Sequence, residues 1–319
     1  MTTPDATDVL TRERGGFRTE LIAHGWLLPS RTAVLPGLGP QANAVYDGLA
    51  ALISRTTRAR FAAPVTAVRF PPVFSASMLE RTDYVASFPQ LLGTISSFTG
   101  EQSEYRELID VYDRGGDWQG RLSPTGLAVA SAACHPLYAY LEGTTAAGAT
   151  VYEMTGECFR HEPSDDPMRF VAFRMREYVV VGSEQQARAH RVQGIAIARG
   201  IFEALGLVID VVPANDPFFG RGGAMLAASQ LQDEAKFELV TEVYAGRPTA
   251  IGSGNYHGTH FGAEFALHQA DGTVAHSACS AYGMERIVFA LAARHGFEIV
   301  DWPPRVRELL GLADVGAVA

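Results

Sequence analysis

The chain has 319 residues, of which 47% are hydrophobic and 19% are charged, and this composition excludes disordered and fibrous proteins. Its 26 Lys and Arg residues and 35 Asp and Glu residues give a formal net charge of -9, so the overall field repels nucleic-acid backbones and anionic membranes. No apolar run approaches the ~18 residues of a membrane span, and the N-terminal stretch lacks a signal-peptide pattern. The composition predicts a cytoplasmic protein without a nucleic-acid or membrane partner.

The three cysteines, Cys134, Cys158 and Cys279, stand far apart, and none belongs to a CxxC pair. An odd number at such spacings argues against the disulfide framework of a secreted protein. The thiols are expected to be reduced, and to be either buried or bound to a metal ion.

The N-terminal half is predicted to be mainly helical, with turns between the helices. Residues 1–15 are expected to be flexible, and apolar residues have helical spacing over 17–26 and 42–53. The sequence then predicts an edge strand from Val65, a short helix or loop, a mixed segment over 101–112, a turn over 114–124 and a helix around Pro136 over 125–143.

The C-terminal half is predicted to be a sheet with two long helices. Residues 150–159 and 169–181 are β-rich and are separated by turn-forming residues, which indicates an antiparallel pair. Further elements are predicted as a helix over 184–205, strands over 207–213, 236–244, 259–267 and 273–282, and a closing helix over 284–295. Strands joined by loops favour an α+β fold with an antiparallel sheet flanked by helices. No repeat or linker is visible, so we expect a single domain over 1–319.

Charged and aromatic residues gather around the predicted antiparallel pair. At steps of four, Arg169, Phe173 and Glu177 point to one side of a strand, and Arg160 is expected to share a face with Glu162 on the partner strand. Such a face suits a nucleotide. An exposed sheet face with cross-strand Arg–Glu pairs explains the same spacing at least as well.

A second pattern, Gly283-x-x-Arg286, joins a strand to a helix. An Arg in the first turn of a helix, beside free backbone N–H groups, makes a site for phosphate oxygens. An ordinary strand–helix joint with a glycine is the alternative.

Taken together, these patterns resemble motifs 2 and 3 of class II aminoacyl-tRNA synthetases. Further segments, ACHPLY, FFGRGG to KFEL, NYHGTHFG and HSACSAYGMER, resemble the amino acid:[carrier protein] ligases, truncated homologues of the atypical zinc-containing seryl-tRNA synthetases. The resemblance runs from about Phe17 to Leu312. It implies a class II synthetase-like catalytic domain, and the chain has no further segment large enough for a tRNA-binding domain.

The resemblance also implies a catalytic zinc ion held by Cys134, Glu177 and Cys279. Two thiolates and a carboxylate leave a fourth position open for substrate. Without the resemblance, both cysteines read as buried hydrophobes and Glu177 as part of a salt bridge. Cys158 is expected to pack in the core. The remaining competitors for the metal are expected to be pocket or second-layer residues: His257, His260, His268 and His276.

The implied reaction has two steps. ATP first activates a small amino acid, glycine or alanine in this family, and the thiol of a phosphopantetheinylated carrier protein then takes the aminoacyl group. Arg160 would hold the α-phosphate, Glu162 the adenine amino group and Arg286 the γ-phosphate, while Phe173 stacks on adenine and Arg169 completes the ATP site. Mg²⁺ would neutralise the phosphates, and zinc would hold the amino group of the amino acid.

Two alternatives remain at this level: a true aminoacyl-tRNA synthetase, and a non-catalytic paralogue that binds amino acid or nucleotide. Residues 69–84 resemble motif 1, through which class II domains pair, so a homodimer is expected. Because carrier proteins are usually acidic, a local basic patch is expected for docking, with Arg58, Arg60, Arg69 and Arg221 as its candidates.

Overall fold

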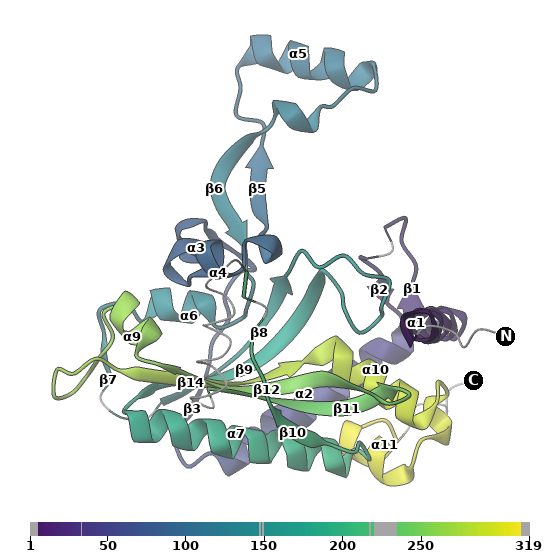
Figure 1. The fold of residues 1–319 in the computed structure, drawn as a ribbon, viewed down its shortest axis with the longest axis vertical. Coiled ribbons are helices and arrows are strands. Elements are labelled where there is room, and N and C mark those ends of the chain that lie inside the picture. Colours follow the sequence, from purple (N-terminus) through teal and green to yellow (C-terminus); the bar gives the residue numbers. More distant parts are fainter. Residues whose placement is uncertain are drawn as a thin grey trace.

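A computed structural model describes residues 6–32, 34–146, 148, 150–216, 218–219 and 235–313; Arg221 lies outside the described residues. The centre of this part is a seven-stranded sheet (Figure 1). Its strands lie in the order β10 (Asp210–Pro213), β11 (Lys236–Tyr244), β12 (Arg247–Gly258), β14 (His276–Gly283), β9 (Ala172–Gly182), β8 (Thr150–Phe159) and β3 (Val65–Ala67). Neighbouring strands are antiparallel except for β3 and β8, which confirms the predicted antiparallel α+β sheet with Val65 in an edge strand.

Four helices cover one face of this sheet and enclose the main hydrophobic core (Figure 1). They are α2 (Pro40–Arg60), α7 (Glu184–Ala204), α10 (Met284–His295) and α11 (Pro304–Leu310). The ends of α7 follow from local sequence: the Ser183 side chain accepts a hydrogen bond from Gln186 N–H, and Gly206 has φ +82° just after the helix. The opposite face carries a smaller apolar cluster, beneath α6 (His135–Tyr140) and α9 (His260–Glu264).

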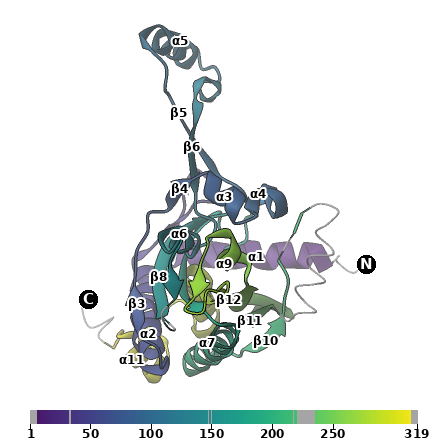
Figure 2. The same cartoon turned by 90° about the vertical axis from the view of Figure 1, so that its left-hand side faces the viewer.

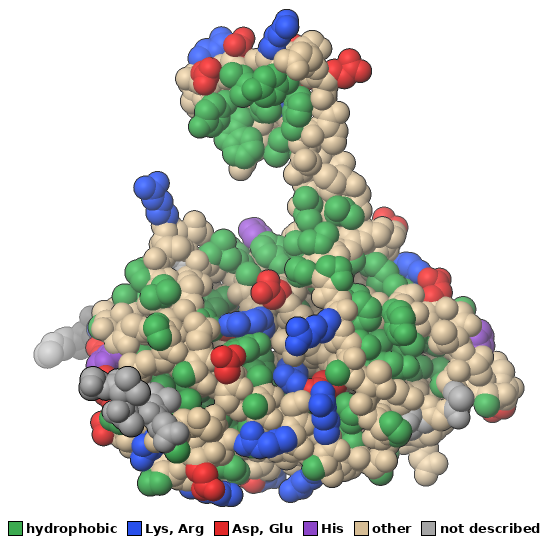
Figure 3. Space-filling view, turned by 180° about the vertical axis from the view of Figure 1, so that it is seen from behind, with side chains coloured by type: hydrophobic (Ala, Val, Ile, Leu, Met, Phe, Trp, Pro, Cys, Tyr) green, Lys and Arg blue, Asp and Glu red, His purple; other side chains and the backbone are tan. Residues whose placement is uncertain are grey.

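A second, three-stranded sheet projects from the body as an arm (Figures 1 and 2). It consists of β4 (Val73–Ser75), β6 (Ser123–Val129) and β5 (Thr94–Ser97), and it carries α5 (Gln102–Asp113) at its far end. In Figure 3, apolar side chains gather on the side of this end that faces the body. The exposed large hydrophobic residues of the arm are Tyr105, Tyr112, Trp118 and Leu127.

The smaller elements complete the described chain. These are α1 (Ala6–Ala23), β1 (Leu27–Leu28), β2 (Gly37–Leu38), α3 (Ser77–Arg81), α4 (Tyr84–Ser87), the 3₁₀ turns 89–91, 119–121 and 299–301, β7 (Thr145–Ala146) and β13 (His268–Gln269). No helix in the described ranges combines the length and the apolar character needed to cross a bilayer.

Several predicted elements were wrong. The first helix begins at Ala6, so residues 6–15 are helical. The mixed segment 101–112 is a helix whose N-terminus is capped by a capping box between Glu101 and Glu104. The predicted helix over 125–143 is strand β6 followed by the short α6, because β6 pairs with strands distant in sequence. The segment 259–267 holds α9 rather than a strand, since Gly258, at φ +58°, ends β12. Strand β12 was not predicted, and α11 follows the supposed closing helix.

Candidate active site

A cavity of about 480 Å³ opens on the sheet face opposite α7, beneath α4, α6 and α9. Seven of the eight predicted site residues line it: Cys134, Arg160, Glu162, Phe173, Glu177, Cys279 and Arg286. The eighth, Arg169, lies beside the cavity, with its guanidinium 3.3 Å from Glu162. The structure therefore brings together residues that stand more than 150 positions apart in the chain.

Strand alternation places part of this set. Phe173 and Glu177 share one face of β9, as predicted, and Glu177 lies directly opposite Ala281 of β14. Arg160 and Arg169 lie outside the strands, because β8 ends at Phe159 and β9 begins at Ala172. The prediction that strand alternation aligns them with their neighbours was therefore wrong. A tight turn after β8 positions Arg160 and Glu162 instead, because the N–H of Glu162 donates to the carbonyl of Arg160 at 2.7 Å.

The two thiols and the carboxylate meet at the deep end of the cavity. Cys134 is the N-cap residue of α6, and its thiol lies near enough to the Glu177 carboxylate for each group to shift the pKa of the other. Cys279, on β14, accepts a hydrogen bond from the side-chain amide of Asn255 at 3.2 Å. The three groups are 5%, 2% and 3% exposed. Burial raises the pKa of all three, and the charge of Glu177 raises the pKa of both thiols further.

This donor set fits a zinc ion by its chemistry. Thiolates and carboxylates are zinc ligands, and in so buried a place their charged forms need a compensating cation. Among the described residues, no three His, Cys, Asp or Glu side chains already stand at positions that could hold a metal ion. Cys158, the third thiol, is 3% exposed in the smaller apolar cluster, which agrees with its predicted role in packing.

Arg160 and Phe173 form one wall of the cavity. The guanidinium carbon of Arg160 lies 5.5 Å from the centre of the Phe173 ring, and its Nε donates to the carbonyl of Ser131 at 3.1 Å. These contacts fix the Arg160 guanidinium beside the Phe173 ring. A ligand with a flat ring and an anionic group could stack on Phe173 and place its negative charge at Arg160.

Arg286 extends from the first turn of α10 into the cavity. It donates to two backbone carbonyls, those of Met168 at 2.7 Å and Ala250 at 3.0 Å. Burial lowers the pKa of Arg286, and the charges of Arg169 and Arg160 lower it further. The guanidinium groups of Arg160, Arg169 and Arg286 are thus close enough to affect one another electrostatically, and together they could bind several phosphate charges.

Sequence reasoning missed an ion-pair cluster on the β11 side of the cavity. Lys236 Nζ lies 2.5 Å from Asp216 Oδ1 and 3.3 Å from Glu238 Oε1, and all three residues line the cavity. The signal was present in the sequence, because Lys236 is the only lysine among 26 cationic residues.

The four histidines separate into two groups. His257 and His260 line the cavity, as expected of pocket residues, whereas His268 and His276 are not among the lining residues. Burial lowers the pKa of His257 to about 3, so this ring is neutral at physiological pH.

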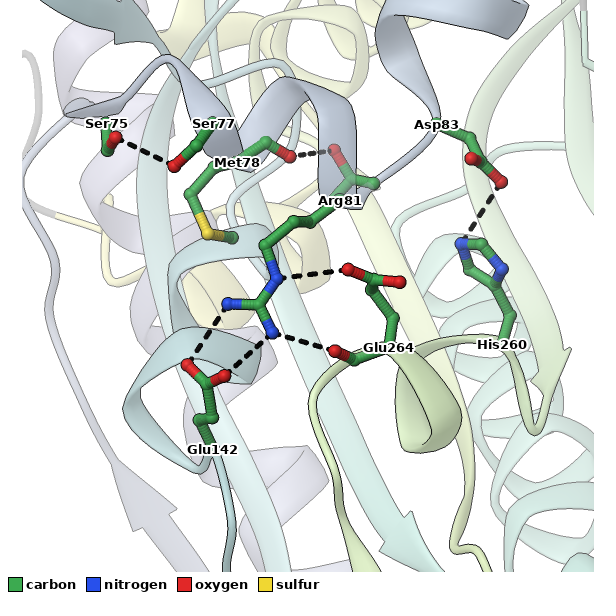
Figure 4. Close-up of polar contacts among 9 residues, drawn as sticks. Ser75, Ser77, Met78, Arg81, Asp83, Glu142, His260 and Glu264 are labelled. Carbon is green, nitrogen blue, oxygen red and sulfur yellow. Dashed lines mark hydrogen bonds and ion pairs between the residues drawn. The ribbon is translucent and has the colours of Figure 1, made fainter.

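Beside the cavity, Arg81 of α3 contacts two carboxylates from other elements (Figure 4). Its guanidinium binds both oxygens of Glu142 at 2.9 and 3.1 Å, contacts Glu264 Oε1 at 3.1 Å and lies 4.0 Å from the Phe265 ring centre. Glu142 follows α6 and Glu264 ends α9, so one side chain ties α3 to the two helices above the cavity.

Next to the Arg81 contacts, Asp83 and His260 face each other at the edge of the cavity, with 3.6 Å between Asp83 Oδ2 and His260 Nε2 (Figure 4). Asp83 has φ +58°, an uncommon conformation for a residue other than glycine.

Comparison with known proteins identifies relatives across most of the chain. It is 44% identical over 273 residues to "Amino acid--[acyl-carrier-protein] ligase 2" of Bradyrhizobium diazoefficiens, covering 84% of this chain and 80% of the relative. For ligase 1 of the same organism the identity is 39% over 272 residues, covering 84% and 83%. A type-2 serine--tRNA ligase of Methanopyrus kandleri is 27% identical over 209 residues, covering 60% of this chain and 39% of the relative. No family model matches the chain.

Solved structures show the same fold. The M. kandleri seryl-tRNA synthetase, in complex with A. aeolicus tRNASec, superposes with a TM-score of 0.79 at 22% identity, covering 93% of this chain and 60% of that one. A cytoplasmic serine-tRNA ligase of Naegleria fowleri, in complex with AMP, gives a TM-score of 0.69 at 14% identity, covering 93% and 59%. The predicted class II synthetase-like fold is thereby confirmed.

Proposed function

The chain belongs to the family of amino acid--[acyl-carrier-protein] ligases, and on this premise we propose that it activates a small amino acid with ATP and transfers it to the phosphopantetheine thiol of a carrier protein. One observation carries the proposal for the site. One cavity contains two buried thiols and a buried carboxylate at one end. Two arginines and an aromatic ring line its wall, and a third arginine lies at its edge.

The arginines and Phe173 suit the activation step. In that step an amino acid carboxylate oxygen attacks the α-phosphorus of ATP, and the bond to pyrophosphate breaks. Arg160 would stabilise the charge on the α-phosphate and Arg286 the γ-phosphate, while Phe173 stacks on adenine. Glu162 would accept from the adenine amino group, with Arg169 holding its carboxylate. Mg²⁺ would neutralise phosphate charge.

The deep end of the cavity suits the amino group of the amino acid. Cys134, Glu177 and Cys279 would hold zinc, which supplies a Lewis acid for an uncharged amine. With the amine bound at this end and the phosphates bound by the arginines, the carboxylate of a small amino acid would be placed between them.

Transfer to the carrier needs no nucleophile from this chain. The phosphopantetheine sulfur attacks the carbonyl carbon of the aminoacyl adenylate, the bond from that carbon to the phosphate oxygen breaks, and AMP leaves. The thiol proton passes to water or to the departing phosphate.

We also propose a homodimer formed through residues 69–84, which follow the edge strand β3 and include β4 and α3. Light scattering at micromolar concentration should give twice the mass of one chain. A mass equal to one chain would contradict the proposal.

The reaction is tested in two stages. ATP–pyrophosphate exchange is measured across the amino acids, and exchange with glycine or alanine well above the others is expected. Labelled amino acid and ATP are then incubated with a holo-carrier protein or with tRNA. Labelled carrier supports the proposal, labelled tRNA replaces it with synthetase activity, and no exchange with any amino acid leaves a non-catalytic binding protein.

The metal is tested separately, by elemental analysis of protein purified without chelators. One zinc per chain is expected, and Cys279→Ala should lose it. Cys158→Ala is the matched control, because Cys158 is equally buried and has no role in the proposed metal site. Zinc retained by folded Cys279→Ala would contradict the assignment.

A further inference from the structure

The sulfur of Cys279 faces two nitrogen atoms that come from one strand. Asn255 Nδ2 donates to it at 3.2 Å, and His257 Nε2 lies 3.6 Å away. Asn255 is directly opposite Cys279 in the β12–β14 ladder, and His257 lies two positions further along β12. Both side chains reach the same sulfur atom, although the ladder shifts its register between Tyr256 and Gly258, beside His257.

The other ring nitrogen of His257 faces two hydroxyl groups. Nδ1 lies 3.0 Å from Ser277 Oγ and 3.2 Å from Tyr138 Oη. A hydroxyl can donate to an unprotonated Nδ1, and the hydrogen of the neutral ring then sits on Nε2, which faces the sulfur.

Aromatic packing fixes the plane of this imidazole. The ring meets Tyr138 edge-on, at 6.3 Å between centres and 87° between planes, and Phe261 at 5.1 Å and 73°. Tyr138 has no exposed surface and itself stacks on Phe261 at 4.1 Å. The direction of Nε2 is therefore set by the packed core rather than by a ligand.

We propose that Asn255 and His257 are positioning residues that hold the Cys279 sulfur for metal binding, and that Tyr138 and Ser277 select the His257 tautomer that donates to it. This inference rests on the proposed zinc site. Hydrogen bonds to the atoms that ligate a metal orient them and change metal affinity about 10- to 100-fold when removed.

The chain supplies a matched control. His276 Nδ1 lies 2.7 Å from Tyr256 Oη, and its ring stacks on that tyrosine, so it forms a histidine–tyrosine pair like that of His257 but has no role in the proposed metal site. His276→Phe should leave zinc binding unchanged. His257→Phe keeps an aromatic ring but removes the N–H, and His257→Gln keeps an N–H donor.

Zinc affinity is measured by competition with a chromophoric chelator, and ligand geometry by the thiolate-to-cobalt absorption of Co²⁺-substituted protein. His257→Phe is expected to bind zinc about 10- to 100-fold more weakly and to shift the cobalt spectrum, with partial recovery in His257→Gln. Affinity and spectrum equal to those of the unmodified protein, in both His257→Phe and Asn255→Ala, would overturn the proposal.

A second measurement separates this inference from the proposed function. Nitrogen-15 NMR of the histidine rings in metal-free protein is expected to show His257 with its hydrogen on Nε2, and Tyr138→Phe with Ser277→Ala should disturb that tautomer. A hydrogen on Nδ1 in both metal-free and zinc-loaded protein would overturn the inference. Absence of zinc from the unmodified protein would instead remove the zinc site, while the NMR result still decides the hydrogen bond to Cys279.

Discussion

The backbone N–H of Ala133 donates a hydrogen bond of 2.9 Å to Glu177 Oε1, across 44 positions of the chain. This bond docks the turn that carries Cys134 onto strand β9, so the carboxylate has a structural role as well as a proposed role in metal binding.

Glu177→Gln separates these two roles. The amide oxygen can still accept from Ala133, so we expect the melting temperature to change little, but zinc content should fall well below one per chain because the charge is lost. Glu177→Ala should in addition cost about 1–3 kcal/mol of unfolding free energy, because it leaves a buried N–H unpaired. Glu157→Gln, an exposed carboxylate on β8, is the control for both measurements. Full zinc content in Glu177→Gln would exclude the carboxylate as a ligand.

Arg286→Lys tests the phosphate site. A lysine has one charged nitrogen and cannot reproduce a guanidinium that bonds two carbonyls while reaching a phosphate. We expect kcat/KM for ATP in the exchange reaction to fall about 10- to 100-fold, which corresponds to about 1.5–3 kcal/mol. The control is Arg294→Lys on the same helix, where the arginine is exposed and donates to the carbonyl of Gly206. Equal losses in both variants would indicate a general effect on α10.

Lys236→Met tests the ion-pair cluster. Without the ammonium group, the carboxylates of Asp216 and Glu238 face a cavity proposed to receive a triphosphate. Their repulsion should raise KM for ATP about 10-fold or more, and added salt should reduce the difference because it screens charge. A Lys236→Arg variant should recover part of the affinity. Unchanged KM in Lys236→Met would place the triphosphate away from β11.

Replacing Glu153 tests the stability of the helix-covered face of the sheet, away from the cavity. Glu153 is 2% exposed and bonds to Ser54 at 2.7 Å, to Arg58 at 2.6 Å and to Arg176. Breaking a buried ion pair costs about 3–5 kcal/mol. Glu153→Gln should lower the free energy of unfolding by about 3 kcal/mol, at the low end of this range, because Arg58 is half-exposed. Denaturant unfolding measures this difference. The control is Glu308→Gln in an exposed pair, which should stay within about 0.5 kcal/mol.

The effect of Glu153 should depend on pH. Burial alone raises the pKa of this carboxyl group, but the hydrogen bonds from Ser54, Arg176 and Arg58 outweigh it, and the pKa is lowered overall. A lowered folded-state pKa adds stability above the ordinary value of about 4.3, and this stability is lost as the pH falls through the folded value. The difference between the unmodified protein and Glu153→Gln should be full at pH 7 and should shrink in acid. A difference that grows on acidification would contradict this assignment.

The sequence by itself determined the elements whose signals are local. The helix over 184–205 has its cap at Ser183 and its stop at Gly206, and Phe173 and Glu177 share a face because side chains alternate along a strand. The place of Arg286 in the first turn of α10 likewise follows from neighbouring residues. Resemblance to a family then linked positions that no local pattern connects.

The tertiary structure alone decided what depends on pairing between distant segments. Strand β6 forms where small residues indicated a helix, since its partners β4 and β5 supply the hydrogen bonds. The approach of His257 to Cys279 depends on the register of β12 against β14, and a shift by one residue would turn His257 to the other face. The periodicity of hydrophobic residues predicts which side of a helix or strand is buried, but it does not predict which residues contact that side.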